Sequence, residues 1–164
     1  MIYMRRVFYD APCQDNDYLS RHIQLLIFSY KKTTGQEMIN PSLSEEQAAE
    51  EVFYFPSVVL SHDTQSDPVL TYINQTGLEL FELDWETILT MPSRLTAEPM
   101  ERGERQRLLD KVSKNGFIDD YSGVRVSTTG RRFKIEKVTV WNLMNEAGDY
   151  QGQAAMFSHW SFLE

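Results

Sequence analysis

The stretch PVLTYINQTGLELFELDWETI, residues 68–88, decides the fold class because its hydrophobic period changes in the middle. Apolar residues alternate with others over 69–73, as in a strand, and after Asn74 they recur at helical spacing. A short Asn side chain can accept hydrogen bonds from the amides of a helix's first turn. We therefore predict a strand that passes directly into a helix at Asn74, with a second short helix after Asp84.

Two further residues of this stretch carry packing predictions. Gly77 is unfavourable inside a helix, so we predict that the helix approaches the sheet closely there. Trp85 follows Phe81 by four positions, a spacing that keeps two side chains on nearly the same side. We expect Trp85 to close over Phe81.

Helical patterns precede this stretch, and three strands follow its helices. An amphipathic stripe over 19–30 has Asp17 as its predicted N-cap and Gly35 as its stop, and SEEQ at 44–47 has the form of a capping box. The remaining pattern predicts a strand over 57–63, a helix over 97–116, and strands over 117–128, 131–144 and 151–160.

The predicted fold is therefore α+β, a five-stranded antiparallel sheet with a short helical insert on one face and N-terminal amphipathic helices. We divide the chain into a flexible leader over 1–16, N-terminal helices over 17–55 that pack on the domain, and a core over 56–164.

The strand over 131–144 changes its apolar face. Phe133 and Ile135 share one face, whereas Val138 and Val140 would lie on the other in a regular strand. Either a bulge re-aims the strand, or both faces are covered at that end. We prefer the second interpretation, with the helix over 19–30 as the cover.

Composition and charge limit the classes of function. The chain has 164 residues, a net charge of −8 and one cysteine, Cys13. A single cysteine allows no internal disulfide and favours a cytoplasmic location. An acidic chain without a long apolar run predicts neither nucleic-acid binding nor a membrane span. Basic residues gather only on the helix over 97–116, interleaved with acids, which predicts a solvated, ion-paired face: Arg102, Arg105, Arg107, Lys111 and Lys114.

Several motifs resemble a known family. TYINQTGLELF and NEAGDYQGQAAMF are similar to segments of PAS domains, and LSHD, DWETI, PSRLTAEP, YSGVRVSTTGRRF and TVWNLMNEAG together resemble the PAS-related MEKHLA domain. That domain lies at the C-terminus of plant class III homeodomain–leucine zipper transcription factors. It also occurs as a standalone protein in bacteria and algae. The resemblance, over roughly 20–160, implies a sensory or interaction module of the standalone form, without a settled ligand. It does not imply DNA binding, because the chain has no homeodomain or zipper heptads.

The resemblance also implies a pocket between the inner sheet face and the short helices. Small pockets of this kind are lined by apolar residues and a few polar groups. The candidate lining residues are Tyr72, Asn74, Phe81, Trp85, Arg94, Leu95, Tyr121, Ile135, Trp141 and Met156. The alternative is that these bulky side chains fill a solid core.

The cofactor stays unidentified at this stage. Light-sensing flavin PAS domains have a reactive cysteine where this chain has Ser93, and Cys13 is far away in sequence, so a cysteinyl-flavin is not predicted. The sequence does not exclude a flavin that is bound without a bond to a thiol. No histidine lies in the helices over 75–115, so haem is not predicted either, and the histidines do not have metal-motif spacing. We expect the imidazole of His62 to bond its neighbours in a turn.

Three functions compete. The first, which we prefer, is a non-enzymatic sensory module that binds a small apolar or aromatic ligand, a regulatory protein, or both. The second is a small enzyme in which His62 works with Asp63 or Asp120 as acid and base. The third is a purely structural dimer. We predict the dimer face from the amphipathic helix and the outer sheet face: Ile23, Leu26, Ile27, Tyr30, Val138 and Val140. For the acids near Tyr121, we expect bonds to Arg94 or Arg125 rather than catalysis.

Overall fold

The computed structural model describes residues 10–164, apart from the side chains of residues 99–101, so the first nine residues of the predicted leader lie outside the described residues. The helices are η1 (Gln14–Leu19), α1 (Ser20–Thr34), α2 (Glu45–Phe53), α3 (Gln75–Phe81), α4 (Trp85–Ile88), η2 (Ser93–Thr96) and α5 (Pro99–Asn115). The strands are β1 (Val58–His62), β2 (Leu70–Ile73), β3 (Phe117–Val126), β4 (Arg132–Met144), β5 (Tyr150–Phe157) and β6 (His159–Phe162). None of these helices is long and apolar enough to cross a membrane.

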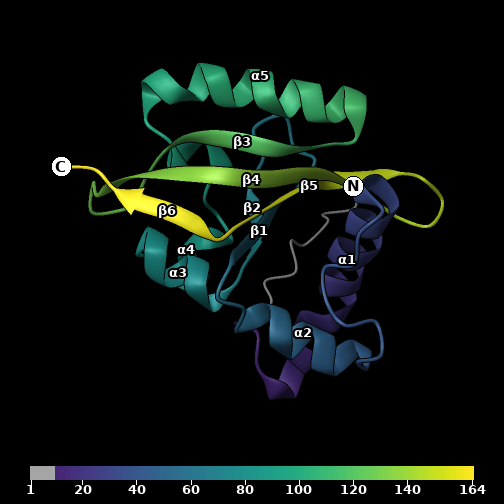
Figure 1. The fold of residues 1–164 in the computed structure, drawn as a ribbon. Helices are drawn as coiled ribbons and strands as arrows, with labels where there is room; N and C mark the ends of the chain where they lie inside the picture. Colours follow the sequence, from purple (N-terminus) through teal and green to yellow (C-terminus); the bar gives the residue numbers. More distant parts are fainter. Residues whose placement is uncertain (1–9) are drawn as a thin grey trace, which may run out of the picture.

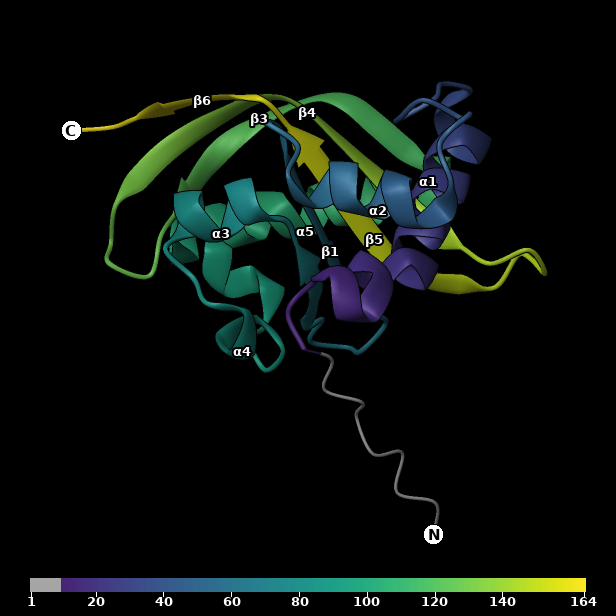
Figure 2. The same cartoon turned by 90° about the horizontal axis from the view of Figure 1, so that it is seen from below.

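The strands form one antiparallel sheet in the order β2-β1-β5-β4-β3, so the predicted α+β class is confirmed (Figure 1). The long strands β3 and β4 curve over the helical insert (Figure 2). The prediction of a single last strand over 151–160 is wrong, because β5 ends at Phe157. A sixth strand then pairs with the first part of β4, so that His159 lies opposite Glu136.

A bulge in β4 explains why its apolar face changes. Lys137 has a φ of 54°, in the left-handed region, and it separates the part of β4 that pairs with β6 from the part that pairs with β5. The extra residue restores Val138 and Val140 to the side of Ile135, where all three line one cavity. The structure therefore places Val138 and Val140 on the opposite face to the one that we predicted.

The second interpretation of β4 holds as well, because α1 covers the outer face of its C-terminal half. The Nε1–H of Trp141 donates to the backbone oxygen of Leu26 at 3.2 Å, and the rings of Tyr30 and Trp141 meet edge to face at 5.0 Å. Both faces of β4 are thus covered at this end. The helix begins later than predicted: Asp17 lies in η1 with a φ of 54°, and α1 starts at Ser20.

The predicted junction at Asn74 is confirmed. Its Oδ1 accepts from the backbone N–H of Gly77 at 3.1 Å, which caps α3, and its Nδ2 donates to the oxygen of Ser57 at 2.8 Å. A Cβ on Gly77 would lie 2.5 Å from Ile73 Cγ1, so the predicted close approach to the sheet is also confirmed.

Trp85 does not close over Phe81. Glu82, with a φ of 55°, ends α3 and redirects the chain before α4 begins. The Trp85 ring packs on Tyr72 at 6.0 Å, whereas the Phe81 ring packs on Phe133 at 5.2 Å. The helical spacing was misleading because the two residues belong to different helices.

Candidate ligand-binding cavity

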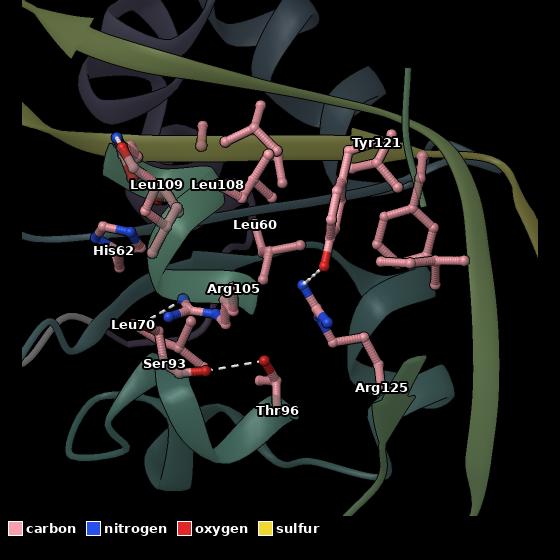
Figure 3. Close-up of a pocket in the computed structure, with 18 of the residues that line it drawn as sticks. Leu60, His62, Leu70, Ser93, Thr96, Arg105, Leu108, Leu109, Tyr121 and Arg125 are labelled. Atoms are coloured by element: carbon pink, nitrogen blue, oxygen red, sulfur yellow. Dashed lines mark hydrogen bonds between the residues drawn. The ribbon is translucent and has the colours of Figure 1, made fainter. Parts of the chain in front are cut away.

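A cavity of about 60 Å³ lies between the inner sheet face and the helices α3, η2 and α5 (Figure 3). Most of its wall is apolar, because alternate residues of β4 and β5 and the inner side of α5 point into it. The apolar lining residues are Leu60, Leu70, Phe81, Leu108, Leu109, Ile135, Val138, Val140, Ala154, Ala155 and Phe157. Since a cavity needs about 10–15 Å³ of such volume to hold one water molecule, this cavity has room for a few water molecules or one small organic molecule.

One side of the cavity is polar and cationic. Arg105 comes from α5 and donates through Nη2 to the Ser93 hydroxyl at 2.8 Å. Arg125 comes from β3 and donates through Nη2 to the Tyr121 hydroxyl at 3.1 Å. Thr96 lies beside them, and Figure 3 shows Leu60 and Leu108 on the other side of the space. The cavity thus combines an apolar wall with hydrogen-bond donors from separate elements.

The two guanidinium groups are held in an unfavourable environment. Burial and, to a lesser extent, the nearby charge of Arg125 lower the pKa of Arg105 to about 10. Arg125 is only 7% exposed and makes a second hydrogen bond, to the oxygen of Val124 at 2.9 Å. A pKa of about 10 keeps Arg105 charged at neutral pH, so the cavity carries positive charge.

His62 lines the same cavity as a neutral imidazole. Burial lowers its pKa, and Nδ1 lies 2.9 Å from the backbone oxygen of Asp63, so Nδ1 carries the proton. The predicted bonding of His62 to its neighbour is confirmed. Nε2 lies near Gln153 but makes no hydrogen bond of normal geometry to it.

The acid–base pair of the enzyme hypothesis is not assembled in this arrangement. The contact of His62 is to the backbone of Asp63, whose carboxylate accepts instead from the backbone N–H of Val69 at 2.9 Å. Asp120 is exposed on β3.

Three of the ten predicted pocket residues line this cavity: Phe81, Tyr121 and Ile135. Tyr72, Asn74 and Trp85 are buried beside it in the core, and Trp141 packs on the other face of the sheet against α1. Arg94 and Leu95 are exposed, with Arg94 bonded to Asp67, and Met156 is half-buried outside the lining. Arg125 bonds Tyr121 and Arg94 bonds Asp67, so the bonds that we expected between these arginines and the acids beside Tyr121 are not found among the described residues.

Arg105 and Ser93 were missed as site residues. The prediction of a solvated basic face on α5 is wrong for Arg105, which points inward. One signal was available: Arg105 precedes Leu108 and Leu109 by three and four positions, so all three lie on one side of the helix.

The predicted dimer face is not exposed. Ile23 and Leu26 are fully buried within the single chain, and Tyr30 is almost fully buried. All three belong to the hydrophobic core of the domain. Ile27 is half-buried. These residues stabilise the domain itself.

The cavity does not fit a flavin. Pockets for ligands of that size measure ~300–1,000 Å³, far more than the space found here. Ser93, which stands where the reactive cysteine would be, is 1% exposed and bonded to Arg105. Within residues 10–164, no three His, Cys, Asp or Glu side chains are grouped closely enough to hold a metal ion.

Solved structures with a similar fold are PAS and light-oxygen-voltage domains. The PAS domain of a protein from Colwellia psychrerythraea matches with a TM-score of 0.61 and 14% identity over 72% of this chain and 95% of that chain. An RNA-binding light-oxygen-voltage receptor matches with a TM-score of 0.58 and 15% identity over 73% of this chain and 33% of that chain. The light-state dimer of the fungal photoreceptor Vivid matches with a TM-score of 0.55 and 13% identity over 92% of this chain and 97% of that chain. The fold is therefore PAS-like.

Curated relatives are plant homeobox-leucine zipper proteins. HOX29 of Oryza sativa subsp. indica is 27% identical over 139 residues, and ATHB-14 of Arabidopsis thaliana is 26% identical over 142 residues. Each alignment covers 82% of this chain but only 16% of the relative, so the similarity concerns one domain of those proteins. The family model of the MEKHLA domain matches residues 20–162, and the chain therefore belongs to the MEKHLA domain family.

Proposed function

We propose that this protein is a non-enzymatic sensory or regulatory module that binds a small molecule with an apolar body and signals to a partner protein. The observation that carries the proposal is the cavity itself, which lies between the helical insert and the sheet. Membership of a PAS-related family and the PAS-like fold support a sensory role. A cavity of this size selects a small ligand, because its walls are packed side chains of the core.

The strand β4 connects the cavity with the outer face of the domain. Val140 lines the cavity, and the next residue, Trp141, points to the opposite face and donates to Leu26 of α1. Ser29 of α1 also accepts from the backbone N–H of Met144 at 2.9 Å. A ligand that displaces β4 therefore changes the packing of α1, and α1 is the element whose shift a partner would detect.

The proposal is tested with a variant whose cavity is filled. Ala155 lies opposite Leu60 of β1 and Val140 of β4, and all three line the cavity. Ala155→Leu should fill the space while it keeps the fold. We would purify both proteins, look for co-purifying small molecules by native mass spectrometry, and screen small apolar and aromatic molecules by ¹H–¹⁵N NMR.

The expected result is binding to the native protein alone, with shifts in the amides of β4, β5 and α1. If neither protein binds any molecule, or if both bind equally, the cavity is not a ligand site and the sensory proposal fails. Sedimentation velocity on the same samples measures self-association, which would have to use a surface other than the buried stripe of α1.

A further inference from the structure

Arg105 and Arg125 face one cavity without a carboxylate to balance them. Among the described residues, no acidic side chain forms an ion pair with either guanidinium. Asp67 favours the charge of Arg105 only weakly, and its own ion pair is with Arg94 at 3.1 Å. Arginines that are withdrawn from water are ordinarily paired with acids. Among the described side chains, this pair has no such partner.

The hydrogen bonds that the two side chains make are too few to replace that charge. A guanidinium has five N–H donors. Arg105 makes one hydrogen bond, to Ser93, and Arg125 makes two, to Val124 and Tyr121. All three acceptors are neutral. Two like charges beside one largely apolar cavity repel each other, and they attract an anion.

The other polar groups on this side of the cavity can also donate. Ser93 and Tyr121 accept from the arginines through their oxygens, so their own hydroxyl protons remain available. Around these groups the wall is aliphatic or aromatic, with Leu60, Leu70 and Phe81 among its members. The site therefore suits a small molecule with a negatively charged end and an apolar remainder.

We propose that the ligand of this cavity is a small organic carboxylate, whose carboxylate lies between Arg105 and Arg125 and whose apolar part contacts the leucine-rich wall. The planar fork of a guanidinium matches the two oxygens of a carboxylate. A phosphate would bring more charge and no apolar part for this wall. The inference rests on the proposed ligand-binding function and specifies the ligand's class.

The test compares two probes of nearly equal shape, butyrate and butyramide, which differ in charge. Each is titrated into the ¹⁵N-labelled 164-residue protein, and sodium phosphate and benzoate are titrated in parallel. The variants are Arg105→Gln, Arg125→Gln and Arg105→Lys, which keeps the charge but not the fork. Arg107→Gln is the matched control, because Arg107 is exposed on the same helix.

We expect a carboxylate, butyrate or benzoate, to bind at least tenfold more tightly than butyramide, and each Arg→Gln change to weaken that binding at least tenfold. The affinity of Arg105→Lys for the carboxylate should lie between those of the native protein and Arg105→Gln. Arg107→Gln should leave this affinity unchanged. Without ligand, Arg105→Gln should melt no lower than the native protein, because it removes a desolvated charge. If Arg125→Gln does not fold, the two Arg105 variants decide the question.

The outcomes that would overturn the inference differ from those that overturn the proposed function. Equal binding of butyrate and butyramide would remove the anion site but keep a ligand-binding module. Phosphate binding more tightly than both carboxylates would replace the proposed class with inorganic anions. If none of the four probes binds, and Ala155→Leu behaves like the native protein, both the inference and the proposed function fail.

Discussion

Replacing Asn74 by alanine should be among the most destabilising single changes in this domain. The side chain is fully buried and makes four hydrogen bonds. Its Oδ1 accepts from the backbone N–H groups of Gly77 and Val59, both at 3.1 Å. Its Nδ2 donates to the oxygens of Val52 at 3.0 Å and Ser57 at 2.8 Å. One amide thus joins α2, β1 and the start of α3.

The expected loss follows from these bonds. Loss of an N-cap costs ~1 kcal/mol, and each of the other three hydrogen bonds contributes about 1 kcal/mol. Asn74→Ala should therefore lower the free energy of unfolding by about 4 kcal/mol, out of the ~5–15 kcal/mol that is usual for a domain. With a urea slope of ~2 kcal/mol/M, the unfolding midpoint should fall by about 2 M.

The assay is urea unfolding at 25 °C followed by tryptophan fluorescence. Asp84→Ala is the matched control, because Asp84 caps α4 through one hydrogen bond, from the Thr87 N–H at 2.8 Å, and makes no link to the sheet. It should lose only ~1 kcal/mol. If Asn74→Ala costs no more than Asp84→Ala at an equal slope, Asn74 acts as a helix cap alone and the reasoning is refuted.

Three other changes test separate parts of the structure. Gly152→Ala should cost about 3 kcal/mol in urea unfolding, because its Cβ would lie 2.0 Å from the His62 backbone oxygen at a φ of 123°; a loss under 1 kcal/mol would contradict this close approach. Gly77→Ala should cost ~1–2 kcal/mol, since the new methyl would meet Cγ1 and Cδ1 of Ile73, and it should cost less in an Ile73→Ala background, which lacks both atoms; an equal cost in the two backgrounds would show that Ile73 is not the obstacle. His22, whose Nε2 lies 2.9 Å from the Ser61 hydroxyl, has its pKa lowered to about 4 by burial. The neutral imidazole therefore contributes its full stabilisation of the folded protein above about pH 6.5, and the free energy of unfolding should fall by ~3 kcal/mol as the pH falls toward 4. If the pH–stability curve of His22→Gln runs parallel to the native curve, His22 is not the cause of that loss.

The sequence was most informative where structure depends on neighbouring residues. Asn74 and Ser44 cap their helices as predicted, with the Ser44 hydroxyl accepting from Gln47 at 3.2 Å, and Gly35 ends α1 with a φ of 75°. Each of these signals acts within four residues. Together with the strand and helix periods of the apolar residues, these signals were sufficient to predict the α+β class. They also predicted that α1 covers one face of the sheet.

The direction of side chains in β4 depended on a feature that the pattern did not locate. A single extra residue at Lys137 reverses the faces of every later position, so Val138 and Val140 point to the cavity and Trp141 to α1. Lysine is not a residue type that favours a positive φ, so no local signal marked the bulge. This bulge explains why Trp141 was wrongly assigned to the pocket and Val138 and Val140 to the dimer face. The other misassigned residues lie on β2, β5, α1, α4 and η2 or at the start of α3, where the sequence showed burial or polarity but not which residues line the cavity.

Arg105 failed for a different reason, which bears on function. Charges on α5 were read as a solvated face because acids are interleaved with them, yet the position of each charge relative to Leu108 and Leu109 is the better guide. A cation on the apolar side of a helix either reaches past the core to water or enters it. Arg105 is half-buried where it lines the cavity, and if it served only to support the fold, an acidic partner would be expected beside it. The other cation beside it is Arg125, so the two charges repel each other, and an anion between them would offset that repulsion. Groups that are destabilising alone and stabilising with a ligand belong to a binding site, which is why the cavity and its two arginines are best explained together.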